Sequence, residues 1–94
     1  MNYLDELGAR IRAQVPRADL PDENTHGLFR IYAVLLLAKG TAVTPEDVHN
    51  AWVAWMAGLD ADHEALVPFE DLDPAIASDD EPFAEAIRIV AKAF

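Results

Sequence analysis

The apolar positions along the chain recur with helical spacing in four separate segments. In the first segment, an apolar residue returns every three or four positions, at Leu4, Leu7, Ile11 and Val15. This spacing predicts a helix from about residue 2 to residue 15, and Pro16 is expected to end it. The polar connector that follows, from residue 17 to residue 24, favours turns.

The second segment is apolar on almost every side, at Leu28, Phe29, Ile31, Tyr32, Val34, Leu35, Leu36 and Leu37. It predicts a helix that begins at a cap formed by Asn24 or Thr25 and ends at Gly40. A helix that is apolar on every side is expected to be buried on every side. We therefore expect residues 25–39 to form the central element of the fold.

The third segment has the clearest start signal in the chain. Thr44 is expected to cap a helix whose first residue is Pro45, and Asp47 lies where its side chain can return the hydrogen bond. The predicted apolar stripe of this helix consists of Val48, Trp52, Trp55 and Leu59.

The fourth segment predicts a helix from Glu81 or Pro82 to the end of the chain. Its apolar face consists of Phe83, Ile87, Val90 and Phe94, and Asp79, Asp80 and Glu81 lie at its start, where they are expected to act in capping. Together the four segments predict an all-α fold with a single domain over residues 1–94. We expect a compact bundle of four helices around the central apolar helix of about residues 25–39.

Charge is distributed very unevenly along the chain. The formal net charge is −10, and the segment from Asp60 to Glu85 holds ten carboxylates without one Lys or Arg. Such acidity argues against direct binding of nucleic acid or of an anionic membrane, because basic side chains hold those partners. It fits either simple solubility or an acidic face for a basic protein partner.

Three further features of the sequence indicate where in the cell the protein is located. The chain has no cysteine, which removes disulfides and thiolate metal sites. The longest apolar run, from Ile31 to Ala38, is far shorter than the ~20 residues of a membrane span. No basic and apolar leader follows Met1. We therefore expect a soluble, cytoplasmic protein.

The patterns that could support catalysis or metal binding are weak. Asp60, Asp62, Glu64 and Asp71 have the spacing of a calcium loop, but Ala65 stands where the sharp turn needs glycine. The histidines, at positions 26, 49 and 63, are not paired on one helix turn. The single serine, at position 78, lacks a glycine elbow, and no glycine-rich phosphate loop is present. We expect no catalytic residue, no metal site and no cofactor, and hence a protein that is not an enzyme.

Two aromatic features point to packing or to a partner. Trp52 and Trp55 lie three positions apart, which suits either a core or a surface that meets a partner or ligand. After them, Pro68 biases Val67 away from helix and predicts an extended turn. The apolar residues of this turn, Leu66, Phe69 and Leu72, are expected to enter the core as anchors.

Three motifs resemble the repeat of ryanodine receptors, which also occurs as a free-standing domain in bacteria and phages. The motifs are residues 47–52 with His49 and Trp52, His63 with the Leu-Val-Pro-Phe-Glu-Asp-Leu turn at 66–72, and residues 80–87. The resemblance covers residues 43–94 and matches His49, Trp52, His63, Leu66, Pro68, Phe69 and Leu72 to the signature of the repeat. It implies a module for interactions or for sensing a nucleotide-like ligand. The whole chain also resembles a family of small actinobacterial and actinophage proteins.

These observations lead to three hypotheses of function. The first is a non-enzymatic interaction module of a bacterium or phage, with a homodimer as its candidate assembly, that presents the acidic face of residues 60–85 to a basic protein partner. The second is a sensor of a nucleotide-like small molecule that uses the region of Trp52, His63 and Phe69. The third is an acidic mimic that occupies a nucleic-acid-binding surface. The candidate ligand or partner residues are His49, Trp52, Trp55, His63, Phe69, Glu70, Asp71 and Asp73.

Overall fold

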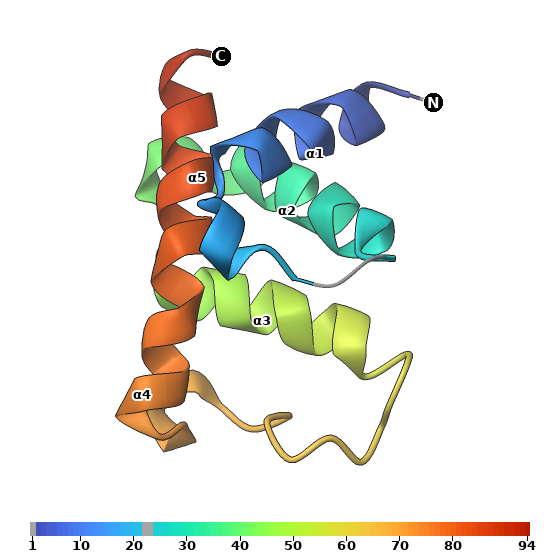
Figure 1. The fold of residues 1–94 in the computed structure, drawn as a ribbon, viewed down its shortest axis with the longest axis vertical. Helices are drawn as coiled ribbons and strands as arrows, with labels where there is room; N and C mark the ends of the chain where they lie inside the picture. Colours follow the sequence, from blue (N-terminus) through green and yellow to red (C-terminus); the bar gives the residue numbers. More distant parts are fainter. Residues whose placement is uncertain (1, 22–23) are drawn as a thin grey trace.

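The computed structural model describes residues 2–21 and 24–94 (Figure 1). Within them lie four helices of twelve to fourteen residues, one helix of four residues and four 3-10 turns, and no β-strand. The long helices are α1 (Tyr3–Gln14), α2 (His26–Lys39), α3 (Pro45–Met56) and α5 (Glu81–Lys92). The prediction of an all-α bundle of four helices is confirmed.

Helix α1 begins at a reciprocal cap. The Asn2 side chain accepts hydrogen bonds from the backbone N–H groups of Leu4 and Asp5, and the Asp5 carboxylate accepts one from the N–H of Asn2. Such a cap satisfies donors that the first turn of a helix leaves free. The apolar stripe of α1, with Leu7 and Ile11, is buried in the core, as its spacing predicted.

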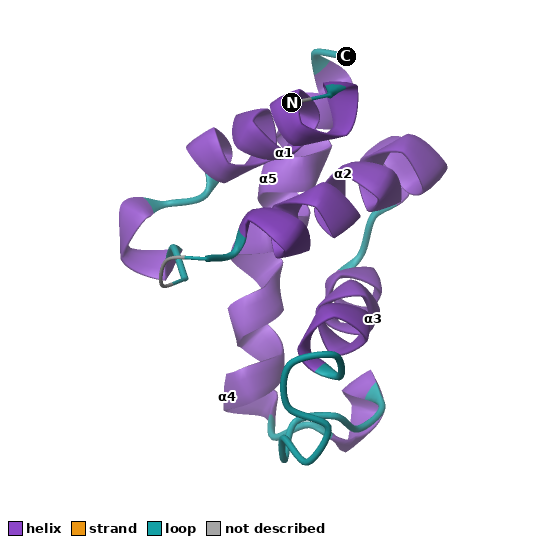
Figure 2. Cartoon of the chain, turned by 90° about the vertical axis from the view of Figure 1, so that its right-hand side faces the viewer, coloured by secondary structure: helices purple, strands orange, loops and turns teal. Residues whose placement is uncertain are grey.

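Helices α1 and α2 lie side by side in both views (Figures 1 and 2) and approach each other closely at Gly8. A Cβ atom at this position would lie 2.9 Å from the carbonyl oxygen of Phe29, so only glycine lets the two backbones approach so closely. At the same interface, the Asp5 carboxylate lies 2.8 Å from both His26 Nε2 and Arg30 Nη2. The N–H of Asn2 and the Arg30 guanidinium lower the pKa of Asp5 to about 2.

Helix α2 is central, because it contacts α1, α3 and α5. The prediction that it is buried on every side is wrong, since Val34 is 50% and Leu37 48% exposed. Three helices cover most of its circumference and leave one strip open to water. Thr25 precedes the helix, but its hydroxyl accepts a hydrogen bond from Arg12 and does not cap α2. Gly40 ends the helix with a φ of +57°, as the glycine predicted.

Helix α3 begins at the predicted capping box. The Thr44 hydroxyl accepts a hydrogen bond from the N–H of Asp47 at 3.2 Å, and the Asp47 carboxylate accepts one from the N–H of Thr44 at 2.9 Å. Lys39 at the end of α2 also donates to this carboxylate, which joins the two helices. Because α3 ends at Met56, Leu59 lies beyond it and is exposed, so its predicted place in the stripe is wrong.

The acidic connection, residues 57–80, passes around the lower end of the bundle in Figure 1. It contains the 3-10 turn Phe69–Asp71, the short helix α4 (Pro74–Ala77), which Asp73 caps, and the turn Ser78–Asp80. The predicted anchors, Leu66, Phe69 and Leu72, are only partly buried and lie outside the core. That prediction is wrong because the extended backbone around Pro68 passes along the edge of the bundle.

Helix α5 closes the core with Ala84, Ala86, Ile87 and Val90. It continues directly from the turn Ser78–Asp80, and the Asp80 side chain makes no capping hydrogen bond, so its predicted capping role is wrong. Phe94 lies past the helix end and is exposed, unlike the rest of its predicted stripe. None of the described helices combines the length and the apolar character that crossing a membrane requires.

Candidate functional site

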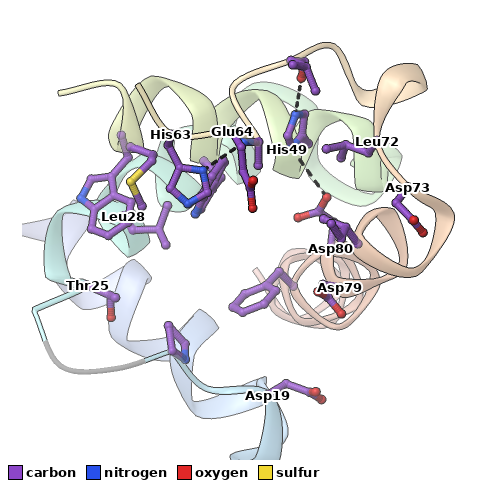
Figure 3. Close-up of a pocket in the computed structure, with 18 of the residues that line it drawn as sticks. Asp19, Thr25, Leu28, His49, His63, Glu64, Leu72, Asp73, Asp79 and Asp80 are labelled. Atoms are coloured by element: carbon purple, nitrogen blue, oxygen red, sulfur yellow. Dashed lines mark hydrogen bonds and ion pairs between the residues drawn. The ribbon is translucent and has the colours of Figure 1, made fainter. Parts of the chain in front are cut away.

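A cleft of about 940 Å³ opens on one side of the bundle. Its walls come from the connector after α1, the first half of α2, helix α3, the acidic connection and the start of α5. Figure 3 shows Asp19 and Thr25 on one side of the opening and His49, His63 and Glu64 on the other. Segments that are distant in the sequence therefore meet at this site.

The cleft carries a strongly negative rim. Six carboxylates line it, Asp19 from the connector after α1 and the other five from the acidic connection: Glu64, Asp71, Asp73, Asp79 and Asp80. Within the described part of the chain, no Lys or Arg side chain joins them. A cleft lined by one sign of charge concentrates ligands of the opposite sign, so this one favours cations.

The deeper walls of the cleft are apolar and largely aromatic. They are formed by Leu28, Tyr32, Trp52, Trp55, Met56 and Phe83. Both tryptophans are partly buried, and they pack against the core while they also line the cleft. The two roles that the sequence left open for this pair, core residue and ligand-facing surface, are thus combined in the same side chains.

His49 lies at one polar end of the cleft and is only 3% exposed. Its Nε2 atom lies 2.7 Å from the carbonyl oxygen of Val67. Because a carbonyl oxygen can only accept, Nε2 carries the hydrogen, and in the neutral ring Nδ1 has a free lone pair. This Nδ1 faces a carboxylate oxygen of Asp80 at 3.9 Å (Figure 3), which is too far for a hydrogen bond.

Asp80 and Tyr32 complete this polar group. The Asp80 side chain is 16% exposed, and burial raises the pKa of Asp80 to about 6, with His49 acting against the rise and Asp79 adding to it. The Tyr32 ring is buried, and burial together with the Asp80 charge raises the pKa of the Tyr32 hydroxyl. The hydroxyl therefore stays neutral and can both donate and accept hydrogen bonds.

His63 is held by the loop and by a tryptophan. Its Nδ1 atom accepts a hydrogen bond from the N–H of Ala65 at 3.0 Å, and its ring stands edge-on to Trp52 with 5.1 Å between the ring centres. The His49 ring stacks on the same tryptophan, with 5.9 Å between the ring centres. The two histidines and Trp52 therefore form one contiguous wall.

Most of the residues that the sequence singled out line the cleft: His49, Trp52, Trp55, His63, Asp71 and Asp73. Phe69 packs against His49 with 6.0 Å between ring centres, but neither Phe69 nor the exposed Glu70 lines the cleft. Sequence reasoning missed Leu28, Tyr32, Asp80 and Phe83 as lining residues. The helical spacing of Leu28, Tyr32 and Phe83 indicated core packing, and the position of Asp80 at a helix start indicated capping. No local signal in the sequence showed that these residues would line the same cleft.

The same residues show little that suits catalysis or metal binding. His26 pairs with Asp5 at the α1–α2 interface, so the three histidines do not converge. Among the described residues, no three His, Asp or Glu side chains are grouped to hold a metal ion. The Ser78 hydroxyl donates to the carbonyl oxygen of Ala75 at 2.8 Å. The cleft instead offers hydrogen-bond acceptors beside aromatic surfaces, which suits a cationic and partly apolar group.

Together, the fold and the cleft define a small all-α protein with an acidic, aromatic-walled cleft. Residues 2–92 match the domain of unknown function DUF7701, and the chain belongs to this family. Neither the curated proteins nor the solved structures gave a match to the chain. The resemblances to the ryanodine receptor repeat and to actinobacterial and actinophage proteins stay predictions.

Proposed function

We propose that this protein is a non-enzymatic interaction module that binds a basic segment of a partner protein on its acidic face, residues 60–85. The observation that carries this proposal is the composition of the cleft, whose rim is acidic and whose walls are aromatic and apolar. A basic segment with apolar residues complements both parts of such a surface. Complementary charge also guides the encounter of two proteins and excludes wrong partners.

Part of the acidic face is not engaged within the fold. Glu70 and Asp71 are exposed and form no ion pair with a described residue, whereas Glu81 and Glu85 both pair with Arg88. Carboxylates without an internal counter-charge keep their full field for a partner. Asp71 on the rim of the cleft, and its neighbour Glu70 on the acidic face, are therefore the first candidates for contacts with the partner.

The two alternative functions have weaker support. Trp52 and His63 do line the cleft, as a small-molecule sensor needs, but the phosphates of a nucleotide would face carboxylates there. None of the arginines that could compensate, Arg10, Arg12, Arg17 and Arg30, lines the cleft. A nucleic-acid mimic needs free carboxylates at phosphate-like positions, and Asp73, Glu81 and Glu85 are engaged by the fold.

The test uses two double variants that remove the same charge from different surfaces. Glu70→Gln with Asp71→Asn neutralises the acidic face, and Glu6→Gln with Glu46→Gln neutralises exposed carboxylates on α1 and α3. Binding of a labelled peptide of alternating Arg and Leu is measured by fluorescence anisotropy at physiological ionic strength, with a Glu and Leu peptide as the negative probe. We expect the first variant to weaken binding by about tenfold and the second to leave it nearly unchanged.

Two outcomes would contradict the proposal. If both variants weaken binding equally, net charge alone attracts the peptide and no particular face is used. If the wild-type protein does not bind the basic peptide, or binds the acidic one as well, the acidic face has no role in partner recognition.

A further inference from the structure

Three polar groups from three helices or turns line the same cleft. They are the hydroxyl of Tyr32 from α2, Nδ1 of His49 from α3 and the carboxylate of Asp80 before α5. The Tyr32 residue is 2% and His49 is 3% exposed, so each is almost entirely surrounded by protein. Among the described residues, no hydrogen bond to these three groups is formed, and because no buried side-chain nitrogen or oxygen there lacks a partner, these polar atoms are accessible to solvent.

The facing atoms of His49 and Asp80 are both hydrogen-bond acceptors. Since Nε2 of His49 donates to the Val67 carbonyl, Nδ1 in the neutral form of the ring presents a lone pair to the Asp80 oxygen 3.9 Å away. Two acceptors held this close repel each other unless a donor shares them. The fold thus leaves a place for a group that brings several N–H donors and a positive charge.

The surroundings restrict what such a group can be. Trp52 and Phe83 line the same cleft, and their ring faces attract a cation that has lost part of its water. A guanidinium is planar, weakly hydrated and carries five N–H donors, so it can stack on a ring and serve several acceptors at once. An ammonium is a compact, strongly hydrated charge and suits a buried, ring-lined site less well.

We propose that Asp80, His49 and Tyr32 form a binding subsite for the guanidinium of an arginine side chain that the basic partner inserts into the cleft. This inference rests on the proposed function, because the arginine belongs to the same partner segment. The cleft volume of about 940 Å³ exceeds what one arginine fills, and the apolar neighbours of that arginine occupy the rest, against Leu28, Trp55 and Met56.

The experiment compares two capped tripeptides, Leu-Arg-Leu and Leu-citrulline-Leu. Citrulline keeps the shape of arginine but has no charge, so it isolates the guanidinium. The chain has only two tryptophans, and their indole N–H signals in a nitrogen–proton correlation spectrum report directly on the cleft. We expect the arginine peptide to shift both indole signals at millimolar concentration. The citrulline peptide is expected to bind at least about tenfold more weakly.

Two variants locate the subsite. Asp80→Asn removes the proposed counter-charge and is expected to weaken binding of the arginine peptide by about tenfold. Glu46→Gln removes one charge from an exposed carboxylate on α3, outside both the cleft and the acidic face, and leaves binding nearly unchanged. Asp80→Asn removes a poorly solvated charge, so the variant is expected to fold. A lysine tripeptide that binds as tightly as the arginine one would overturn the choice of guanidinium.

The remaining outcomes separate this inference from the proposed function. Equal binding of the citrulline peptide, unchanged binding to Asp80→Asn, or no indole shift at all would overturn the subsite. If in that case the peptide of alternating Arg and Leu still binds the wild-type protein and binds the Glu70 and Asp71 variant more weakly, the proposed function is retained and only the arginine subsite is rejected. If that peptide does not bind the wild-type protein either, both proposals are rejected.

Discussion

The exposure and the pKa of Asp80 depend strongly on the residues that the fold places around it. The sequence places it in a run of acids before a helix, where an exposed, capping carboxylate is the ordinary expectation. The fold instead turns it toward the cleft, where His49 faces it from α3 and Tyr32 lies nearby on α2. A charge held there is poorly solvated, so the site either binds a cation or keeps a destabilising carboxylate.

We expect Asp80→Asn to stabilise the free protein at about pH 8 by about 1–2 kcal/mol, allowing for the partial exposure of the side chain. The pKa of Asp80 is raised to about 6 in the folded state, above the value of 3.8 that the free side chain has. Wild-type protein therefore has the stability contribution of protonated Asp80 below about pH 4 and loses it as the pH rises through about 6. Urea unfolding of both proteins at about pH 4.5 and about pH 8 measures the difference.

The Asp62→Asn variant serves as the control in that experiment, because the exposed Asp62 side chain is expected to give no such pH-dependent gain. An Asp80→Asn effect of the same size at both pH values would show that the substitution acts through packing and that the carboxylate is well solvated.

The helices meet through a few specific contacts. The α1–α2 pair depends on Gly8, which lets the backbones touch, and on Asp5, which pairs with His26 and Arg30 of α2. The α2–α3 pair is joined by Lys39 and Asp47, and Arg88 of α5 donates to the carbonyl oxygen of Val43 at 2.8 Å. These contacts fix how the helices are placed and thereby the width of the cleft between α2, α3 and α5.

Gly8→Ala is expected to destabilise the protein by a net amount of about 1–3 kcal/mol. The added Cβ would lie 2.9 Å from the Phe29 carbonyl oxygen, and this overlap outweighs the helix preference of alanine, which is worth about 1 kcal/mol. Gly27→Ala is the matched control in α2, because its Cβ would meet Trp55 at an ordinary 3.5 Å. We expect that control to be neutral or slightly stabilising in thermal unfolding. If both variants are more stable than the wild-type protein, the backbones of α1 and α2 do not approach each other closely at Gly8.

At the scale of the whole molecule, acidity and compactness act together. The radius of gyration is 12.5 Å, close to the ~12 Å expected for a folded chain of this length, so the cleft is a local hollow in a compact body. A net charge of −10 on so small a body repels itself and weakens the folded state. The homodimer stays a prediction, which light scattering at micromolar concentration would check.

We expect the free energy of unfolding to be greatest near pH 4. From about pH 4 to about pH 6, stability falls, because Asp80 is already ionised in the unfolded chain but has a pKa raised to about 6 in the folded protein. Below about pH 4, Asp5, whose pKa is lowered to about 2, and Asp47, whose pKa is lowered by Lys39 and Thr44 against the effect of burial, become protonated. Stability that is present above about pH 4 is then lost as the pH falls toward 2. Melting temperatures across pH 2–8 test this, and a steady rise up to pH 8 would contradict it.

Local sequence signals predicted the elements well where the cause is local. The Thr44 and Asp47 capping box, the glycine at position 40 and the proline at position 16 each act within one turn of the chain, and each helix end lies near its predicted place. The failures involve exposure. Val34, Leu37, Leu59 and Phe94 are apolar yet face water, because the number and length of neighbouring helices decide which apolar residues are covered.

The sequence by itself determined the helices, their apolar faces and the acidity of residues 60–85, because periodicity, capping and charge are properties of neighbouring residues. It also identified six of the residues that line the cleft as candidates: His49, Trp52, Trp55, His63, Asp71 and Asp73. Only the tertiary structure decided that Tyr32, His49 and Asp80 meet, since they come from separate elements and no local pattern links them. It likewise excluded Phe69 and Glu70 from the cleft lining, because the path of the connection around Pro68 sets the direction of those side chains.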